Sequence, residues 1–373
     1  MPLIEGRLYR KIDKSLLLAV FVLMAFSLAA IYAATSVRGG GMGQALRQGI
    51  YFAVGLGVCA LVASRDYANL PRYVPYLYAI NIGLLIAVEL FSPEVKGAAR
   101  WIKLPIPGMD FKLQPSEFAK ILTIITLSCH VAQMETRIRQ LPYLLLTLVH
   151  IALPTLLIMK QPDLGTALVI VVIWAGIVFV AGAKARHLLG LATAGVLLFG
   201  FAWQFNLLKT YQKERVHTFM NPLSDPKGKG YHVLQSIVAI GGGSVRGQGY
   251  LHGLQTNNRF IPENHTDFIF TVVGEETGFV GGCILLSVYG VILYRGCAIA
   301  AQCDDPLGRL IASGVVSLLA FHLLVNIGMT TGIMPVVGVP LPLMSFGGSA
   351  AWANLAGIGL LFGIGMRKHK LLF

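Results

Sequence analysis

"SLLLAVFVLMAFSLAAIYAA", residues Ser15 to Ala34, is a stretch of 20 residues without a charged side chain. An α-helix needs about 20 mainly apolar residues to cross the hydrocarbon core of a bilayer, because each residue rises about 1.5 Å. Further runs of this kind follow, and of the whole chain 55% of residues are hydrophobic and 13% charged. The sequence therefore predicts an all-α polytopic membrane protein. The basic stretch before Ser15 has no small-residue cleavage site, so we expect a retained span and not a signal peptide.

Apolar runs between polar segments predict about ten transmembrane spans. They start near Ser15, Leu46, Tyr73, Pro115, Pro142, Leu164, His187, Thr266, Leu310 and Ala350. An even number of spans places both chain ends on the same side of the membrane. We see no soluble domain and no clear internal repeat, so residues 1–373 are expected to form a single membrane domain. Its longest polar segment, residues 208–265, is expected to be a large extracytoplasmic loop between the seventh and eighth spans.

The Lys and Arg residues of the short loops predict the orientation, because cytoplasmic loops are enriched in them. Those on one side are Arg7, Arg10, Lys11, Lys14, Arg65, Arg72, Arg137, Arg139, Lys184, Arg186, Arg295, Arg309, Arg367, Lys368 and Lys370. That side, with both termini, is predicted to be cytoplasmic. The opposite, periplasmic side also has two basic loops, residues 92–113 and 208–265. They are either solvated loops, since long loops translocate regardless of charge, or an outward-facing site for an anionic ligand.

Charge and cysteine content argue against several classes of protein. The formal net charge is +13, but the basic residues are dispersed between loops. Membrane topology and an anionic lipid substrate explain this charge better than nucleic acid does. The five cysteines form no CxxC pair or disulfide framework. Four histidines lie in residues 208–265 without an HExxH or a closely spaced Cys/His pattern, so no dedicated zinc site is expected.

The fourth expected span begins with "QPSEFAK", in which Glu117 and Lys120 are three residues apart. This spacing places both side chains on one helical face, where they can pair. One interpretation is a neutralising ion pair between packed helices. The other is that Lys120 binds a phosphate while Glu117 tunes it or binds a cation.

Two further segments can border a site at the membrane edge. In "QPDLGTA", Asp163 precedes the sixth span, where it can cap the helix or contribute a carboxylate to the wall of a site. Residues 326–350, between the last two spans, contain several helix-breaking Pro and Gly residues. Non-helical backbone at membrane depth is tolerated only where it is buried in protein or lines a cavity. This segment is therefore a rigid turn or a cavity wall, and we favour the wall.

The stretch "HTDFIFTVVGEETG", His265 to Gly278, places three acids around the start of the eighth span. Asp267 lies at the membrane edge, where it can cap the helix or act as a general base on a hydroxyl group. Glu275 and Glu276 are eight and nine residues farther along, about 12 to 14 Å on a helix. That distance is too large for a proton shared with Asp267. We expect both glutamates to be bundle-interior groups that organise the cavity.

The large loop contains a helix signal and a glycine pattern. Leu234 to Ile240 is apolar and is followed by Gly241 to Gly243, which predicts a short helix on the outer surface that ends at glycine. The "GQGYLHG" segment, residues 247–253, follows no buried strand, so a nucleotide-binding fold is not indicated. Its glycines are expected to let the loop fold tightly against a ligand.

Taken in order, six motifs closely resemble the SEDS family (shape, elongation, division and sporulation). They are "GAARWI" (97–102), "QPSEFAK" (114–120), "QPDLGTA" (161–167), "NPLSDPKGKGYHVLQS" (221–236), "PENHTDFIFTVVGEETG" (262–278) and "GVPLPLMSFGGSA" (338–350). The large loop resembles the elongation (RodA-type) branch more than the division (FtsW-type) branch. One departure is Gln248, where many relatives have a lysine, so one possible phosphate contact is missing.

The resemblance implies a peptidoglycan glycosyltransferase of ten transmembrane helices in the inner membrane, active during cell elongation and rod-shape maintenance. It implies that lipid II, an undecaprenyl-pyrophosphate-linked disaccharide-pentapeptide, is polymerised at the periplasmic face. It also implies a divalent cation, Mg²⁺ or Mn²⁺, whose ligands it does not identify. The implied partners are a class B penicillin-binding protein, which is a transpeptidase, and other membrane proteins of the elongation complex.

The motif matches indicate which residues of this chain correspond to the site residues of the family. The essential aspartate matches Asp267, expected to be the general base, while Glu117, Lys120, Asp163 and Arg100 match substrate-binding positions. Arg215 and Arg246, from the large loop, are expected to meet the negative charge of the leaving pyrophosphate. Two alternatives are a flippase or transporter of lipid-linked precursors and a scaffold of the wall-synthesis complex. A translocation path predicts polar residues through the cytoplasmic half as well.

Overall fold

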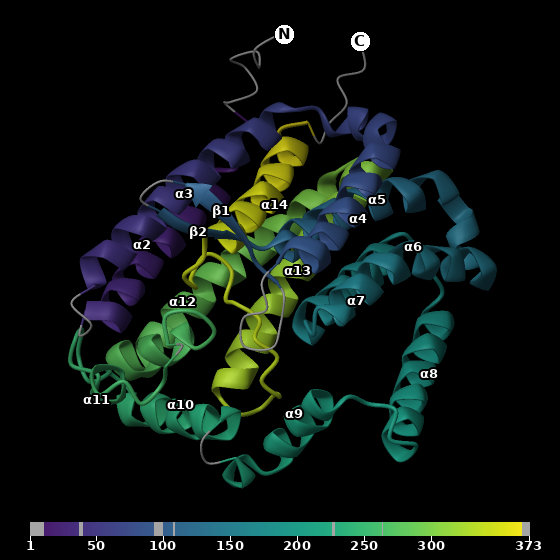
Figure 1. The fold of residues 1–373 in the computed structure, drawn as a ribbon. Helices are drawn as coiled ribbons and strands as arrows, with labels where there is room; N and C mark the ends of the chain where they lie inside the picture. The colour runs from purple at the N-terminus through teal and green to yellow at the C-terminus, as the bar shows by residue number, and fades with distance from the viewer. Residues whose placement is uncertain are drawn as a thin grey trace.

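A computed structural model describes residues 11–36, 40–92, 100–106, 109–225, 228–262 and 264–367 (Figure 1). Ten of its helices coincide with the ten expected spans, which confirms the all-α polytopic fold. They are α2 (Lys14–Ser36), α3 (Gly41–Ser64), α4 (Val74–Phe91), α5 (Pro115–Met134), α6 (Leu141–Lys160), α7 (Leu164–Val180), α8 (Ala185–Gln204), α12 (Ile269–Gln302), α13 (Pro306–Thr330) and α14 (Gly348–Arg367). The 3₁₀ helices η1 (Tyr67–Tyr73) and η2 (Glu135–Arg139) precede α4 and α6.

Eight helices in the described part of the chain are long and apolar enough to cross a membrane. Of the ten, α7 is apolar but has 17 residues, and α5 has 20 residues but carries Glu117 and Lys120 in its first two turns. The helix α5 packs against α4, α7 and α13. A helix enclosed in this way can carry charged side chains because they face protein and not lipid.

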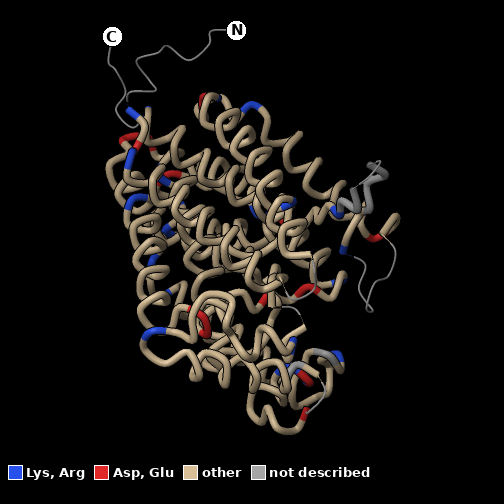
Figure 2. Tube along the Cα trace, turned by 90° about the vertical axis from the view of Figure 1, so that its left-hand side faces the viewer, with Lys and Arg blue, Asp and Glu red and all other residues tan. Residues whose placement is uncertain are grey.

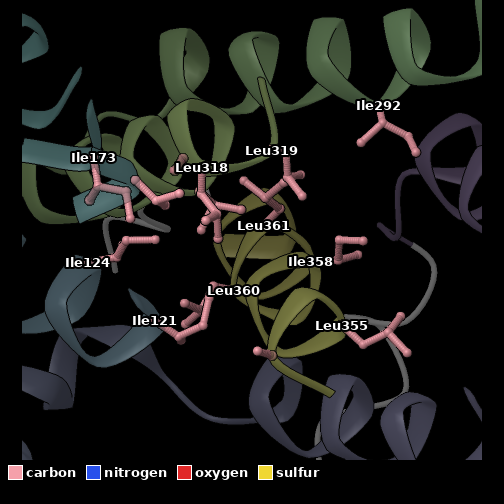
Figure 3. Packing of buried hydrophobic residues seen from close by; sticks show 14 of the residues in the cluster. Ile121, Ile124, Ile173, Ile292, Leu318, Leu319, Leu355, Ile358, Leu360 and Leu361 are labelled. Carbon is pink, nitrogen blue, oxygen red and sulfur yellow. The ribbon is translucent and has the colours of Figure 1, made fainter. Parts of the chain in front are cut away.

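Close packing holds the bundle together, since lipid offers little hydrophobic drive for helices to associate. Figure 3 shows Ile124 of α5, Ile173 of α7 and Leu318 of α13 meeting in the interior, each at most 1% exposed. The helices α3 and α14 approach so closely that a Cβ at Gly359 would lie 2.6 Å from the carbonyl oxygen of Cys59. In contrast, α8 has no buried residue and stands apart from the bundle in Figure 1.

Both polar loops contain regular structure. Residues 208–265 include α9 (Thr210–Met220), η3 (Pro222–Ser224), α10 (Lys229–Gly243) and α11 (Leu254–Asn257). The helix α10 contains the predicted helix and ends at the expected glycines; it lies across the end of the bundle opposite the start of α2 and the end of α14 (Figure 1). In the shorter loop, β1 (Ile102–Ile106) and β2 (Met109–Leu113) form an antiparallel hairpin that the sequence did not predict.

The helix α12 is broken at Gly278, whose φ of 64° and ψ of −162° are not helical. Four backbone hydrogen bonds of 2.9 to 3.1 Å join the chain on either side of the break to the large loop: Gln248 N to Glu275 O, Gly249 N to Glu276 O, Phe279 N to Ser244 O and Val280 N to Val245 O. The glycines of this loop therefore fold against α12, where we had expected a ligand. A Cβ at Gly253 would lie 2.8 Å from a carboxylate oxygen of Glu275, which leaves no room for a side chain.

Candidate active site

A cavity of about 260 Å³ lies at the end of the bundle covered by the large loop. Four segments that are distant in sequence surround it: the hairpin and the start of α5, the start of α7, the residues before α12, and the end of α13 with the segment leading into α14. The lining residues are Arg100, Trp101, Gln114, Glu117, Asp163, Thr166, Val169, Thr266, Asp267, His322, Gly338, Val339, Pro340, Phe346, Gly347, Ser349 and Ala350. Four of the predicted site residues, Arg100, Glu117, Asp163 and Asp267, thus share one cavity.

Next to the cavity, Lys120 of α5 links α5 to α13 through its polar contacts. Its Nζ donates to Oε1 of Glu117 at 2.9 Å and lies 3.1 Å from Nε2 of His322. The other ring nitrogen of His322 lies 3.0 Å from the carbonyl oxygen of Pro340, which can only accept. The ring proton therefore belongs on Nδ1, and Nε2 accepts from the Lys120 ammonium. The ion-pair interpretation is confirmed, although both members of the pair lie on one helix.

Glu117 keeps one oxygen unused. Its side chain is buried, and in the described part of the chain Oε2 has no hydrogen-bond partner. A buried carboxylate oxygen without a donor costs free energy unless a ligand or water satisfies it. Because Glu117 lines the cavity, its carboxylate keeps unfilled hydrogen-bonding capacity next to that cavity.

Asp163 fulfils both roles that the sequence left open. Its carboxylate caps α7 by accepting from Thr166 N at 3.2 Å and Thr166 Oγ1 at 2.9 Å, and it also lines the cavity. Arg100 is tied to the turn just before it. The Arg100 guanidinium donates from Nε to the carbonyl oxygen of Gln161 at 3.0 Å and from Nη2 to that of Pro162. A cation and a carboxylate are therefore held side by side on this wall.

Asp267 is half-buried and lies just before α12. The helix begins at Ile269 with Phe268 at the N-cap position, so Asp267 lies one residue before the cap. Gly338, at φ 71°, passes close to the carboxylate: a Cβ there would lie 3.3 Å from Asp267 Oδ2. Only glycine readily adopts this conformation, so it brings the backbone against the acid.

The irregular segment between α13 and α14 forms the cavity wall that its Pro and Gly residues predicted. The amide of Asn326 donates to the carbonyl oxygens of Asp267 at 2.9 Å and Val339 at 2.8 Å. The hydroxyl of Ser345 donates to the carbonyl oxygen of Thr266 at 2.6 Å. These bonds fix the backbone of Asp267 relative to the wall.

Two predicted substrate contacts are not brought to this cavity. Arg215 lines a separate, smaller cavity next to Pro335 and Val336, with its Nη1 3.5 Å from the carbonyl oxygen of Val337. Arg246 is exposed, between residues whose backbone pairs with α12. Arg100 therefore lines the cavity and Lys120 lies next to it through Glu117, while the substrate-binding roles of all four cations stay predictions.

Glu275 and Glu276 are buried, as expected, but neither lines the cavity. Glu275 accepts from Gln255 N at 2.6 Å, Thr256 N at 3.0 Å and Thr256 Oγ1 at 2.7 Å. The expectation that these acids organise the cavity is therefore corrected: Glu275 anchors α11 of the large loop to α12. Spacing along one helix does not reveal that a loop folds back onto it.

His322 is the residue that sequence reasoning missed. It lies in "FHLLVN", the middle of an otherwise apolar span, and this isolated polar side chain is the signal that could have found it.

The carboxylates suit a hydrated divalent cation. In the described ranges, no group of three or more His, Cys, Asp or Glu side chains is placed to hold a metal ion. Mg²⁺ usually keeps several waters and is bound through one or two carboxylates together with substrate phosphates. Glu117, with its unused oxygen, and Asp163 supply such carboxylates on one cavity.

The chain belongs to the family of cell cycle proteins that comprises FtsW, RodA and SpoVE, whose family model matches residues 12–370. It is 41% identical over 363 residues to the peptidoglycan glycosyltransferase MrdB of Escherichia coli K12, covering 96% of this chain and 95% of that protein. It is 33% identical to the peptidoglycan glycosyltransferase RodA of Treponema pallidum, covering 87% and 90% of the two chains.

Solved structures share the fold. A chain of a peptidoglycan synthase complex, studied for its coordination of polymerization and crosslinking, superposes with a TM-score of 0.80 at 32% identity, over 96% of this chain and 99% of that one. The crystal structure of the rod shape determining protein RodA of Thermus thermophilus gives 0.68 at 27% identity, over 96% and 98%.

Proposed function

We propose that this protein is a peptidoglycan glycosyltransferase that polymerises lipid II into β-1,4-linked glycan strands during cell elongation and releases undecaprenyl pyrophosphate. One observation carries the proposal: Asp267, Glu117, Asp163 and Arg100, from three of the four segments that surround it, line one cavity, and Lys120 lies next to it. Sequence similarity to proteins named as peptidoglycan glycosyltransferases supports it.

In this reaction Asp267 is the general base. Its carboxylate takes the proton from the GlcNAc 4-hydroxyl of the acceptor as that oxygen attacks the anomeric carbon of the donor, whose configuration inverts. The bond from the anomeric carbon to the pyrophosphate oxygen breaks at the same time. The hydrogen bond from the Asn326 amide to the carbonyl oxygen of Asp267 helps to hold the base in a constant position relative to the acceptor.

The leaving group is anionic and needs positive charge. Arg100 lines the cavity and the Lys120 ammonium lies 2.9 Å from Glu117 Oε1, and fixed charges in a site shielded from water stabilise developing charge efficiently. A divalent cation, when bound, would be held by Glu117 and Asp163 and would neutralise pyrophosphate charge.

The membrane setting follows from the charge pattern. We place the protein in the inner membrane. The side of the bundle where α2 starts and α14 ends faces the cytoplasm, and the cavity faces the periplasm. A class B penicillin-binding protein is the proposed partner, which the similarity to a chain of a synthase complex supports. Most of the lining residues lie near one end of the spans, and this favours an enzyme site over a translocation path.

The test is polymer synthesis by the purified protein with its partner. Labelled lipid II and Mg²⁺ or Mn²⁺ are supplied, and the products are separated on a gel. We expect long glycan from the unchanged protein, at least a 100-fold lower rate from Asp267→Asn, and loss of polymer on chelation that added cation restores.

Equal polymer from Asp267→Asn would reject the base assignment while leaving the enzyme class intact. No polymer under any condition would instead favour a flippase or a scaffold, and labelled lipid II in vesicles would then separate those two by its movement between leaflets.

A further inference from the structure

A second polar cavity lies at the opposite end of the bundle from the candidate active site. Its volume is about 370 Å³, and it forms where the start of α2, the later part of α12 and the end of α14 meet. Its lining residues include Lys11, Asp13, Lys14, Ser15 and Arg295. Figure 2 shows several Lys and Arg positions at this end of the molecule.

One carboxylate and one guanidinium form the fixed frame of this pocket. Arg295 of α12 donates from Nε to Oδ2 of Asp13 at 2.7 Å and also from Nη2, while Oδ1 of Asp13 accepts from Leu16 N at 3.0 Å. Burial alone raises the pKa of Asp13, but the hydrogen bonds from Arg295 and Leu16 outweigh it, and the pKa lies below its ordinary value. Asp13 therefore stays ionised and is fully used by Arg295 and the start of α2.

The two lysines are not used in this way. Lys11 and Lys14 are exposed, and within the described residues neither makes a hydrogen bond or an ion pair. Other cations at this end serve the fold: Arg367 donates to the carbonyl oxygens of Ala63, Gly363 and Ser64. With three cations and one carboxylate among its described lining residues, the pocket has surplus positive charge. At Ser15 it adjoins an apolar groove between α2 and α12 that contains the exposed side chains of Leu18, Ile284 and Val291.

This combination matches one kind of ligand. Surplus Lys and Arg at the membrane surface attract anionic lipid headgroups, and each such residue contributes to binding when it lies near the surface. The exposed apolar side chains of the adjoining groove accommodate the upper part of an acyl chain. A soluble anion would use the lysines but would gain nothing from the groove.

We propose that this pocket binds the headgroup of an anionic phospholipid, with its phosphate between Lys11 and Lys14 and an acyl chain in the adjoining groove along Leu18 and Val291. The assignment to the cytoplasmic leaflet rests on the orientation given under the proposed function; the ligand chemistry does not. The pocket shares no lining residue with the cavity around Asp267.

The experiment measures lipid binding by the full-length protein in detergent. Phosphatidylglycerol or phosphatidylcholine is titrated in, and bound lipid is counted by native mass spectrometry. We expect phosphatidylglycerol to bind more tightly than phosphatidylcholine, and the double variant Lys11→Gln/Lys14→Gln to weaken phosphatidylglycerol binding about 30-fold. Lys184→Gln/Arg186→Gln is the matched control, because it removes two exposed charges at the same end, outside the pocket.

Three results would overturn the proposal. Equal binding of the two lipids by the unchanged protein would show that no headgroup is recognised, and this comparison needs no variant. Equal weakening of phosphatidylglycerol binding in the control variant would show that the effect comes from general surface charge. Displacement of the lipid by free glycerol phosphate at similar concentration would identify a soluble anion as the ligand. Lipid II polymerisation in detergent should be unchanged in the double variant, so this test and that of the enzymatic activity fail independently.

Discussion

Two buried glutamates, Glu117 in α5 and Glu275 in α12, have opposite surroundings. Both are at most 3% exposed. Both oxygens of Glu275 accept hydrogen bonds from the large loop. Glu117 lines the cavity and gives one oxygen to Lys120, and among the described residues its other oxygen has no hydrogen-bond partner. Burial is therefore no guide to the role of an acid in this bundle, whereas the number of its hydrogen bonds separates a structural anchor from a group with free chemical capacity.

The largest effect should come from Lys120→Met, which leaves the charge of Glu117 buried without a counter-ion. Removing one partner of a buried pair typically costs about 3 to 5 kcal/mol of stability. We also expect at least a 100-fold fall in polymerisation, because a cation of the site is lost. Thermal unfolding and the lipid II assay measure the two effects.

The double variant Glu117→Gln/Lys120→Met is the control for that prediction. It removes both charges, so stability should largely return while activity should not. Recovery of activity in the double variant would mean that the pair only neutralises itself.

At the α12 break, Gly278→Ala should destabilise the protein by about 3 kcal/mol. The backbone conformation of Gly278 is essentially restricted to glycine, and a Cβ there would overlap the backbone nitrogen of Gly247. Gly290→Ala is the matched control, since a Cβ at this other α12 glycine meets nothing within 4 Å. Thermal unfolding compares them, and an equal midpoint for both variants would contradict the proposed tight contact between loop and break.

The variants Glu275→Gln and Glu117→Gln directly test the different roles assigned to the two glutamates. Hydrogen bonds to a charged group contribute about 1.5 to 3 kcal/mol, so Glu275→Gln should cost about 2 kcal/mol and make residues 244–256 more sensitive to protease. Glu117→Gln should reduce polymerisation with little effect on that protease sensitivity. The reverse pattern would show that the two glutamates have been assigned the wrong roles.

The smallest effect is expected at His322, which supports Lys120 from α13. His322→Leu removes the acceptor at Nε2 and should cost about 1 kcal/mol, or roughly a fivefold fall in polymerisation rate. His322→Gln keeps an acceptor and should retain most of the rate. If Leu and Gln behave alike, His322 acts only by filling space.

Much of the fold follows from local sequence. Span positions were predicted because a transmembrane helix satisfies its own backbone and needs only a run of apolar residues. The helix α10 and the Glu117 to Lys120 pair were also predicted, since a glycine stop and a spacing of three act within one segment. The β1–β2 hairpin was not. The loop glycines were expected to fold against a ligand and Glu275 to organise the cavity, and both expectations were wrong because the contacts of these residues lie in segments distant along the chain.

By itself the sequence determined the membrane class, the ten helices, the family and the acids and bases that could carry chemistry. Only the tertiary structure decided which of them share a cavity: Asp267, Glu117, Asp163 and Arg100 do, whereas Glu275, Arg215 and Arg246 do not. It also placed His322, 202 residues from Lys120 along the chain, within 3.1 Å of it. The physical reason is that helix formation depends on neighbours a few residues away, while a site depends on how whole helices and a folded loop pack against one another.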